Sequence, residues 1–359
     1  MSHVSTAQSD AIGMSVDEDR EGAIIAVESN TNRRALMLLV VLAIAFAFAP
    51  LVIYPVFLMK IMCFAIFASS VNLLLGHGGL LSFGHAAFFG LSAYCTGYLA
   101  KNAGLTPEMA LIAGVVASLT LGAVFGAIAV RRSGIYFAMI TLALAQFVYF
   151  MAVQNPQVTG GEDGLQSIPR GALFGRIQLD GTTLYIFCLV LMLLAVALVH
   201  RIVTSPFGHV LRAIRDNRDR ALTLGYKPER YQWIVYTLSA GLAGLGGGLK
   251  ALVLQVVTLT DLHLTNSAEP ILMTLVGGIG SLSGPVIGAS VIVAIQYYLS
   301  PFGAWVTVLQ GLIFIACVLA FKSGVVGLLS AIEIRIRQLR TRQGDKNPKG
   351  RTTDEQERS

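Results

Sequence analysis

Residues 182–200 read TTLYIFCLVLMLLAVALVH, and this stretch decides the fold class. It contains no aspartate, glutamate, lysine or arginine, and its apolar residues follow one another without alternation. A helix needs about 20 mostly apolar residues to cross a bilayer, whereas a strand of a membrane barrel alternates apolar and polar positions. The stretch therefore predicts a transmembrane helix.

Apolar runs of this kind recur along the whole chain. They lie at 35–54, 56–75, 84–100, 109–130, 134–153, 232–256, 267–280, 285–300 and 304–321. Of the 359 residues, 55% are hydrophobic and only 13% are charged, whereas a soluble domain carries about 25% charged residues. We therefore predict an all-α, polytopic transmembrane helical bundle of about ten spans.

Lysines and arginines gather in a few segments between or beyond these runs. They are Arg33 and Arg34, Arg131 and Arg132, Arg201, the group Arg212, Arg215, Arg218, Arg220, Lys227 and Arg230, and the tail after Lys322. With ten spans all of them lie on one side, and basic residues are retained on the cytoplasmic side. Both termini are therefore predicted to be cytoplasmic, with a disordered acidic tail at 1–34, a transmembrane domain at 35–322 and a basic tail at 323–359.

The net charge of +6 suits anionic lipid headgroups, so the bilayer is an expected partner and nucleic acid is not. The four cysteines, Cys63, Cys95, Cys188 and Cys317, stand singly in apolar runs. They are expected to be small core residues rather than disulfide or metal ligands.

The connection at 154–181, on the predicted outer side, is too long for a simple turn. It contains Gly160, Gly161, Glu162, Asp163 and Gly164, and glycines allow backbone conformations that other residues avoid. This segment is either a docking surface for an outer partner, a gate over a pore, or an ordinary exposed loop.

The cytoplasmic connection at 204–231 carries the signals of a short helix. Ser205 is a suitable N-cap, Pro206 suits the first helical position, Gly225 can take a left-handed conformation, and Pro228 follows. Apolar residues form one stripe, and Arg212–Asp216, Arg215–Asp219 and Asp216–Arg220 are opposite charges four residues apart. One amphipathic helix over 207–224 is predicted, which either rests on lipid headgroups or docks into a groove of a soluble protein.

Sequence blocks in this connection resemble those of a known family. They are SPFG at 205–208, LRAIRDN at 211–217 and ALTLGY at 221–226; in the rest of the chain, GHAAFFG at 84–90, TGGEDG at 159–164, SAE at 267–269 and GGIG at 277–280 agree in order. Over about 35–325, the chain resembles the LivM-type permease subunit of branched-chain amino acid ABC importers. Residues 219–225 keep only the alanine and glycine of the general importer loop, so the coupling role follows from the LivM-type pattern.

The resemblance implies a translocation subunit that is not itself an enzyme and holds no cofactor. The chain has no GxxxxGK[ST] loop and no metal-binding spacing, so ATP and Mg²⁺ would be bound by two cytoplasmic ATP-binding-cassette subunits. A second homologous permease subunit, a periplasmic solute-binding protein and the bacterial inner membrane are also implied. The residues expected to couple to the ATPase are Phe207, Leu211, Arg212, Ile214, Arg215, Asp216, Ala221, Leu222 and Gly225.

Polar residues inside the predicted spans are candidates for the translocation path, because burying them in a bilayer is costly. They are Asn72, His77, His85, Gln146, Lys250 and Glu269. For His85 and Gln146 an interhelical hydrogen bond is the alternative. Lys250 either extends its ammonium group toward water at the outer end of its span or pairs with Glu269. Glycines have two expected roles. The segments 76–79 and 277–280 are either helix breaks near the path or ordinary turns. Close helix packing is expected at three pairs with four-residue spacing: Gly122/Gly126, Gly244/Gly248 and Gly284/Gly288.

Branched-chain amino acids are the substrates that the resemblance implies, with urea, short amides and aromatic acids left open. A secondary transporter or channel that needs no ATPase is the alternative from another class. Such a protein is expected to carry carboxylates or histidine chains at mid-span for ion coupling, and this sequence has almost none.

Overall fold

The computed structural model describes residues 37–315 of the chain, except 39, 174, 304, 306, 307, 310, 313 and 314. The predicted tails at 1–34 and 323–359 lie outside these residues, and so does most of the last predicted span. Helices dominate what is described, so the all-α bundle is confirmed. The longer helices are α2 (Pro55–Asn72), α3 (His85–Asn102), α4 (Pro107–Ala129), α5 (Ile135–Gln154), α7 (Gly181–Thr204), α10 (Pro228–Leu254), α11 (Leu264–Gly277) and α12 (Gly284–Leu299).

Shorter elements connect these helices. An apolar helix at Val40–Leu51 ends in η1 (Ala49–Leu51), and a π-helical turn, η2 (Leu73–His77), continues α2. The others are α6 (Pro156–Thr159), η3 (Gly161–Asp163), α8 (Pro206–Asp216), α9 (Arg218–Thr223), η4 (Leu259–Leu262) and η5 (Ser300–Phe302). Two small antiparallel ladders pair β1 (Leu165–Gln166) with β4 (Val256–Val257) and β2 (Ala172–Leu173) with β3 (Ile177–Gln178).

Five described helices are long and apolar enough to cross a membrane: Pro55–His77, Pro107–Ala129, Ile135–Gln154, Gly181–Thr204 and Pro228–Leu254. The prediction of ten spans and of cytoplasmic termini is therefore not confirmed. α11 and α12 have only 14 and 16 residues. α3 has 18 residues but carries several polar side chains.

The helices differ in how much of their surface lies inside the bundle. In α2 with η2, 89% of the most apolar window is buried, whereas in α5 only 22% is. The exposed side chains of α5 are nevertheless large and apolar, among them Met139, Phe147 and Phe150. An apolar face of that size is unfavourable in water and suits lipid. α2 therefore belongs to the centre of the bundle, and α5 to its lipid-facing surface.

Glycines allow the closest helix contacts, at the predicted Gly122 and also at Gly247, which is not part of a predicted four-residue pair. A Cβ atom on Gly247 of α10 would lie 1.9 Å from the carbonyl oxygen of Phe89 in α3, and one on Gly122 of α4 would lie 2.4 Å from the Cβ of Ala240. Neither distance is possible for real atoms. Small residues here let the backbones of α3, α4 and α10 approach each other directly.

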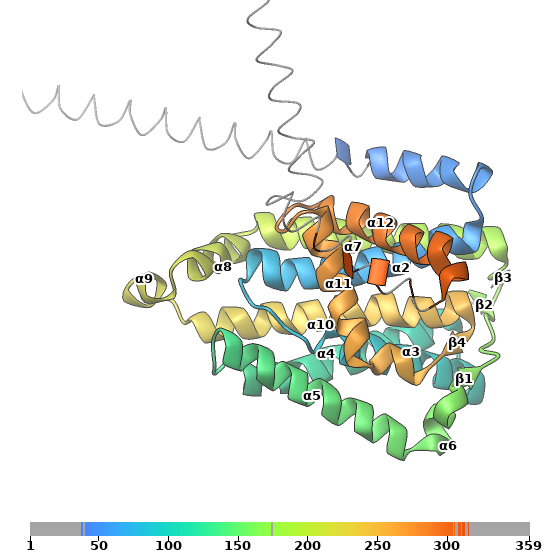
Figure 1. The fold of residues 1–359 in the computed structure, drawn as a ribbon, viewed down its shortest axis with the longest axis horizontal. Helices are drawn as coiled ribbons and strands as arrows, with labels where there is room; N and C mark the ends of the chain where they lie inside the picture. Colours follow the sequence, from blue (N-terminus) through green and yellow to red (C-terminus); the bar gives the residue numbers. More distant parts are fainter. Residues whose placement is uncertain are drawn as a thin grey trace, which may run out of the picture.

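The connections gather at two opposite ends of the bundle (Figure 1). α8 and α9 lie at one end, and β1 to β4 lie at the other. Arg131, which follows α4, lines a pocket of about 200 Å³ together with Glu229 and Arg230 at the start of α10. Two of the basic segments that the sequence places on one side of the membrane are therefore neighbours, at the end that holds α8 and α9.

Candidate functional site

α8 and α9 show which signals in the 204–231 connection determine its structure. The Ser205 side chain caps α8 by accepting a hydrogen bond from the Gly208 amide at 3.4 Å, and Gly225 takes the left-handed conformation with φ +86°. Both agree with the prediction. The prediction of one continuous helix is wrong, because Asn217 is extended and its side chain caps a second helix by accepting from the Arg220 amide at 2.9 Å.

The apolar stripe of α8 faces the bundle and not a partner. Leu211 is fully buried and Ile214 is 2% exposed, and the ring of Phe207 stacks on Tyr231 of α10 with centroids 5.5 Å apart. These residues attach α8 to its own chain, which corrects the expectation that they dock into a soluble protein. The apolar side chains left on the surface belong to α9 and its end: Leu222 is 50% exposed and Leu224 is 69% exposed.

None of the three predicted charge pairs forms at four-residue spacing. Arg212 donates to the Val203 carbonyl at 2.7 Å, and Arg215 pairs with its neighbour Asp216 at 2.9 Å. Arg218 lies 3.7 Å from Glu229 of α10. The break at Asn217 explains the absence of Arg215–Asp219 and Asp216–Arg220, since the residues on either side of it no longer share one helix. Arg212 and Asp216 do share α8, but each has another partner.

Arg215 joins α8 to the first glycine segment. Its guanidinium donates a hydrogen bond to the carbonyl oxygen of Gly76 in η2. A Cβ on Gly79, whose φ is +67°, would lie 2.5 Å from the Arg215 Cγ. The arginine side chain therefore lies directly against the 76–79 segment, and only glycine at position 79 leaves room for it.

Asn72 joins the two glycine segments. Its side-chain amide donates to the Ser281 carbonyl at 2.8 Å, and its oxygen accepts from the Gly280 amide at 2.8 Å. The segment at 277–280 is the turn between α11 and α12, and the one at 76–79 follows a π-helical turn. Segments 200 residues apart thus meet at the same end of the bundle, next to α8. His77 is buried beside them.

His85 and Gln146 lie apart from this cluster. His85 is fully buried and forms a 2.8 Å hydrogen bond with the Ser239 hydroxyl, which donates to the Ser70 carbonyl at 2.7 Å. It links α3, α10 and α2, which supports the packing alternative. Gln146 lies half-buried on α5, away from the centre of the bundle.

At the opposite end, the predicted pair between Lys250 and Glu269 is not formed. Lys250 instead forms an ion pair with Asp261 of η4, and both side chains are largely buried. Glu269 accepts a hydrogen bond from the Gln296 amide of α12 at 3.1 Å. Lys60 of α2, which was not among the predicted residues, is half-buried with its ammonium group 5.9 Å from the centre of the Phe64 ring. Sequence reasoning missed Asp261 because it lies in a short connection, and missed Lys60 because one lysine does not interrupt an apolar run.

The glycine-rich loop that the sequence predicts on the outer side is held against the α10–α11 connection. Gly160, Gly161 and Gly164 all have positive φ, at +78°, +65° and +70°. β1, which follows them, pairs with β4, and a Cβ on Gly164 would lie 2.1 Å from the Val257 carbonyl oxygen. Glu162 and Asp163 remain exposed in η3. The acidic tip is therefore free at the surface while its glycines fix the loop in place.

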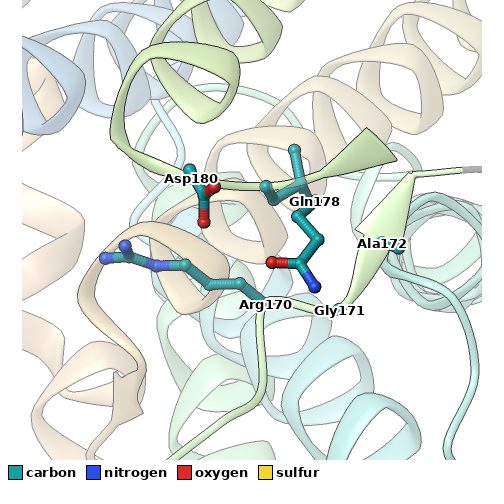
Figure 2. A pocket seen from close by; sticks show the side chains of 6 residues that line it. Arg170, Gly171, Ala172, Gln178 and Asp180 are labelled. Carbon is teal, nitrogen blue, oxygen red and sulfur yellow. The ribbon is translucent and has the colours of Figure 1, made fainter. Parts of the chain in front are cut away.

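A shallow pocket of about 370 Å³ lies beside this loop (Figure 2). It is lined by Arg170, Gly171, Ala172, Gln178, Leu179 and Asp180. Arg170 is held there by a hydrogen bond to the Val253 carbonyl at 3.0 Å. Gly171, Gln178 and Asp180, half of the lining residues, are exposed, so the pocket is a surface depression at the end of the bundle that holds β1 to β4.

Among the residues that the structure describes, no group of three or more histidine, cysteine, aspartate or glutamate side chains could hold a metal ion.

Comparison with known proteins identifies the family. A model of the branched-chain amino acid transport system permease component matches residues 53–320. The chain belongs to this family. It is 26% identical over 312 residues to the high-affinity branched-chain amino acid transport system permease protein LivM of Escherichia coli K12, covering 80% of this chain and 73% of that one. The LivM protein of Salmonella typhimurium LT2 is likewise 26% identical, over 313 residues, with the same coverage.

A solved ABC transporter, described as of the metal-chelate type and in an inward-facing conformation, aligns with 82% of this chain and 99% of its own. Its identity is 17% and the TM-score is 0.42, a likeness too distant to bear on the fold. Family membership and the apolar helices together establish a multi-pass membrane permease, and the family is one of transport proteins rather than enzymes.

Proposed function

We propose that this chain is a membrane-spanning subunit of an ATP-driven importer of branched-chain amino acids, in which α8 and α9 receive the force of a cytoplasmic ATPase. Family membership and the LivM relatives support the substrate class. Leucine, isoleucine and valine are the expected substrates, and urea, short amides and aromatic acids are the competitors against which they are tested.

The observation that carries the proposal is the attachment of α8 to the first glycine segment, which Asn72 of α2 joins to the second. Arg215 binds the Gly76 carbonyl, and Asn72, one turn earlier, binds the α11–α12 turn at Gly280. Any displacement of α8 therefore acts on α2 and on the α11–α12 pair together. Alternating access needs an element of this kind, whose position biases the equilibrium between two arrangements of the helices.

α9 supplies the surface on which the ATPase would dock. Leu222 and Leu224 are exposed and apolar, and Asp219 and Arg220 beside them are exposed and charged. Apolar contacts provide affinity and flanking charges provide orientation in such helix-in-groove contacts. Of the residues expected to couple to the ATPase, Leu222 would contact it, whereas Phe207, Leu211 and Ile214 would hold α8 in place.

The remaining partners follow from the same proposal. Two ATPase subunits would bind ATP and Mg²⁺, and a second homologous permease subunit would complete the path through the bacterial inner membrane. A periplasmic solute-binding protein would dock at the end of the bundle that holds β1 to β4. Exposed Glu162 and Asp163 support a docking or gating role for the outer loop. Asn72 and His77 would lie at the inner end of the path and Lys250 and Glu269 at its outer end, while His85 and Gln146 serve packing.

Co-purification tests the docking proposal. The full complex, solubilised gently, should retain its ATPase subunits, and Leu222→Asp combined with Leu224→Asp should reduce that retention by about tenfold or more, since a charge placed in an apolar contact costs more than 1.4 kcal/mol. Leu105→Asp is a matched control, because Leu105 is an exposed leucine in the connection between α3 and α4. Equal retention in the double variant and the control would contradict docking through α9.

A further inference from the structure

A pocket of about 200 Å³ lies where the last turn of α4 meets the first turns of α10. Both helices are long and apolar enough to cross a membrane, so the pocket lies near the level where the hydrocarbon core ends and the lipid headgroups begin. It is lined by Gly126, Ala127, Val130, Arg131, Glu229, Arg230 and Trp233. The proposed function gives this pocket no role.

Trp233 forms one wall of the pocket and is fixed against α4. Its indole Nε1 donates a hydrogen bond to the Ala123 carbonyl at 2.8 Å. A Cβ on Gly126 would lie 3.0 Å from the Trp233 Cδ1, so glycine at this position lets the ring lie directly on the α4 backbone. Trp233 nevertheless remains 39% exposed. A partly exposed tryptophan at the end of a span is typical of the membrane–water interface.

Arg131 and Arg230 give the pocket two positive charges. Both arginines are exposed, and neither belongs to an ion pair within the described part of the chain. Glu229 is the only acidic residue in the lining, and its carboxylate lies 3.7 Å from Arg218 of α9. The first turn of α10 adds the partial positive charge of a helix N-terminus. The pocket therefore has an excess of positive charge, which favours an anionic ligand.

A stripe on α4, almost entirely apolar, runs from this pocket along the span. Its members are exposed and follow one another at spacings of three or four residues: Ile112, Val116, Thr120, Val124 and Ala127. Residues at these spacings share one face of a helix. The Thr120 hydroxyl donates to the Ala117 carbonyl of its own helix at 2.8 Å, which suits contact with hydrocarbon. Because Ala127 also lines the pocket, the stripe and the pocket are continuous.

We propose that this pocket binds the phosphate group of an anionic phospholipid, whose acyl chains lie along the α4 stripe. The guanidinium groups of Arg131 and Arg230 donate charge-assisted hydrogen bonds to the phosphate oxygens, and Trp233 packs against the glycerol region. A zwitterionic lipid carries a compensating ammonium group, so it gains less from the two arginines. A soluble phosphate would use only the arginines, whereas a phospholipid also uses the apolar stripe that begins at the pocket.

Quenching of Trp233 fluorescence tests this site directly. The chain has two tryptophans, so Trp305→Phe leaves Trp233 as the single tryptophan, in the wall of the pocket. The full chain with this change is reconstituted into vesicles in which either phosphatidylglycerol or phosphatidylcholine has brominated acyl chains, which quench a nearby indole. Phosphatidylglycerol should bind beside Trp233 about tenfold or more tightly than phosphatidylcholine, because each arginine near the surface attracts an anionic lipid. Arg131→Gln combined with Arg230→Gln should bind both lipids equally.

Arg176→Gln combined with Arg201→Gln is the matched control. It removes the same charge from two exposed arginines outside the pocket lining, so the preference for phosphatidylglycerol should remain. Equal binding of both lipids when all arginines are present would overturn the site, and so would an unchanged preference in the Arg131→Gln/Arg230→Gln variant. Loss of the preference in millimolar inorganic phosphate would also overturn it, because the pocket would then be a site for a soluble anion.

Lipid retention by the assembled importer provides a second test, in which the ATPase is present. After mild extraction from membranes, mass spectrometry should find an anionic phospholipid on the complex, and the Arg131→Gln/Arg230→Gln variant should lose it while the control variant keeps it. Lipid bound to the isolated chain but absent from the complex would show that the ATPase covers the pocket, which overturns the site. A complex that retains the lipid but imports no leucine would support the site and refute only the proposed function.

Discussion

Arg215 of α8 donates a hydrogen bond to the backbone carbonyl of Gly76, a residue 139 positions earlier in the chain. Gly76 lies in the π-helical turn that ends the first long span, four residues after Asn72. The contact thus links a helix outside the bundle to the helix that is most deeply buried within it. Four predictions follow from this arrangement and from the packing around it.

Arg215→Ala should uncouple transport from ATP hydrolysis. A hydrogen bond from a charged group contributes about 1.5–3 kcal/mol, so its loss should lower uptake per ATP hydrolysed by about tenfold or more. ATPase subunits should still co-purify, because α9 is unchanged. Arg132→Ala, at an exposed position in the connection after α4, serves as the control. Equal uptake per ATP hydrolysed in the two variants would show that the Arg215 contact does not couple ATP hydrolysis to transport.

Asn72→Ala should destabilise the bundle, since it leaves the Gly280 amide and the Ser281 carbonyl without their partner. Both hydrogen bonds are partly buried, and the loss of such a bond costs about 0.5–1.5 kcal/mol. The apparent melting temperature of the detergent-purified protein should fall. Asn102→Ala, at the exposed end of α3, should leave it unchanged; an identical fall in both variants would mean that the Asn72 bonds contribute nothing specific.

Gly247→Ala should disrupt the contact between α3 and α10. The added methyl group would overlap the Phe89 carbonyl, and overpacking of this kind costs about 1–3 kcal/mol. Reduced yield of folded protein and a lower melting temperature are expected. Gly181→Ala meets no atom within 4 Å and should be neutral. If both alanines were tolerated equally, the close approach of these backbones would be wrong.

Lys250→Met should cost far more stability than Asp216→Asn. Removing one partner of a buried ion pair costs about 3–5 kcal/mol because the other charge stays buried and unpaired. Asp216, in contrast, is an exposed partner of Arg215, and exposed pairs contribute about 0–1 kcal/mol. Thermal unfolding of both variants measures the difference. The double variant Lys250→Met/Asp261→Leu should recover part of the loss, and no recovery would argue against a direct pair.

Local sequence signals predicted local structure well. Ser205 caps α8 and Gly225 is left-handed because both effects depend on the residue itself and its nearest neighbours. The glycines of α10 pack as their spacing indicates. The class of the fold followed from the apolar runs for the same reason, since a bilayer imposes its demands on each run separately.

Relationships between distant residues were harder to predict. The stripe of Leu211 and Ile214 shows that α8 has an apolar side but not whether its own bundle or a partner covers it. Asn217 breaks the helix because its side chain accepts a hydrogen bond from the Arg220 amide. Such a side-chain bond competes with the backbone hydrogen bonds of a continuous helix, and the periodicity of apolar residues does not reveal this. The choice of Asp261 over Glu269 as the partner of Lys250 depends on how α11 enters the bundle, which charge and spacing alone leave open.

The central claim is that α8 and α9 couple this permease to an ATPase that drives amino-acid import. Uptake of labelled leucine into proteoliposomes that contain the assembled complex, with loaded binding protein outside and ATP inside, tests it most directly. We expect uptake that requires ATP and is lost in the Leu222→Asp/Leu224→Asp variant. Equal uptake without ATP, or by this chain reconstituted without any ATPase subunit, would contradict the claim.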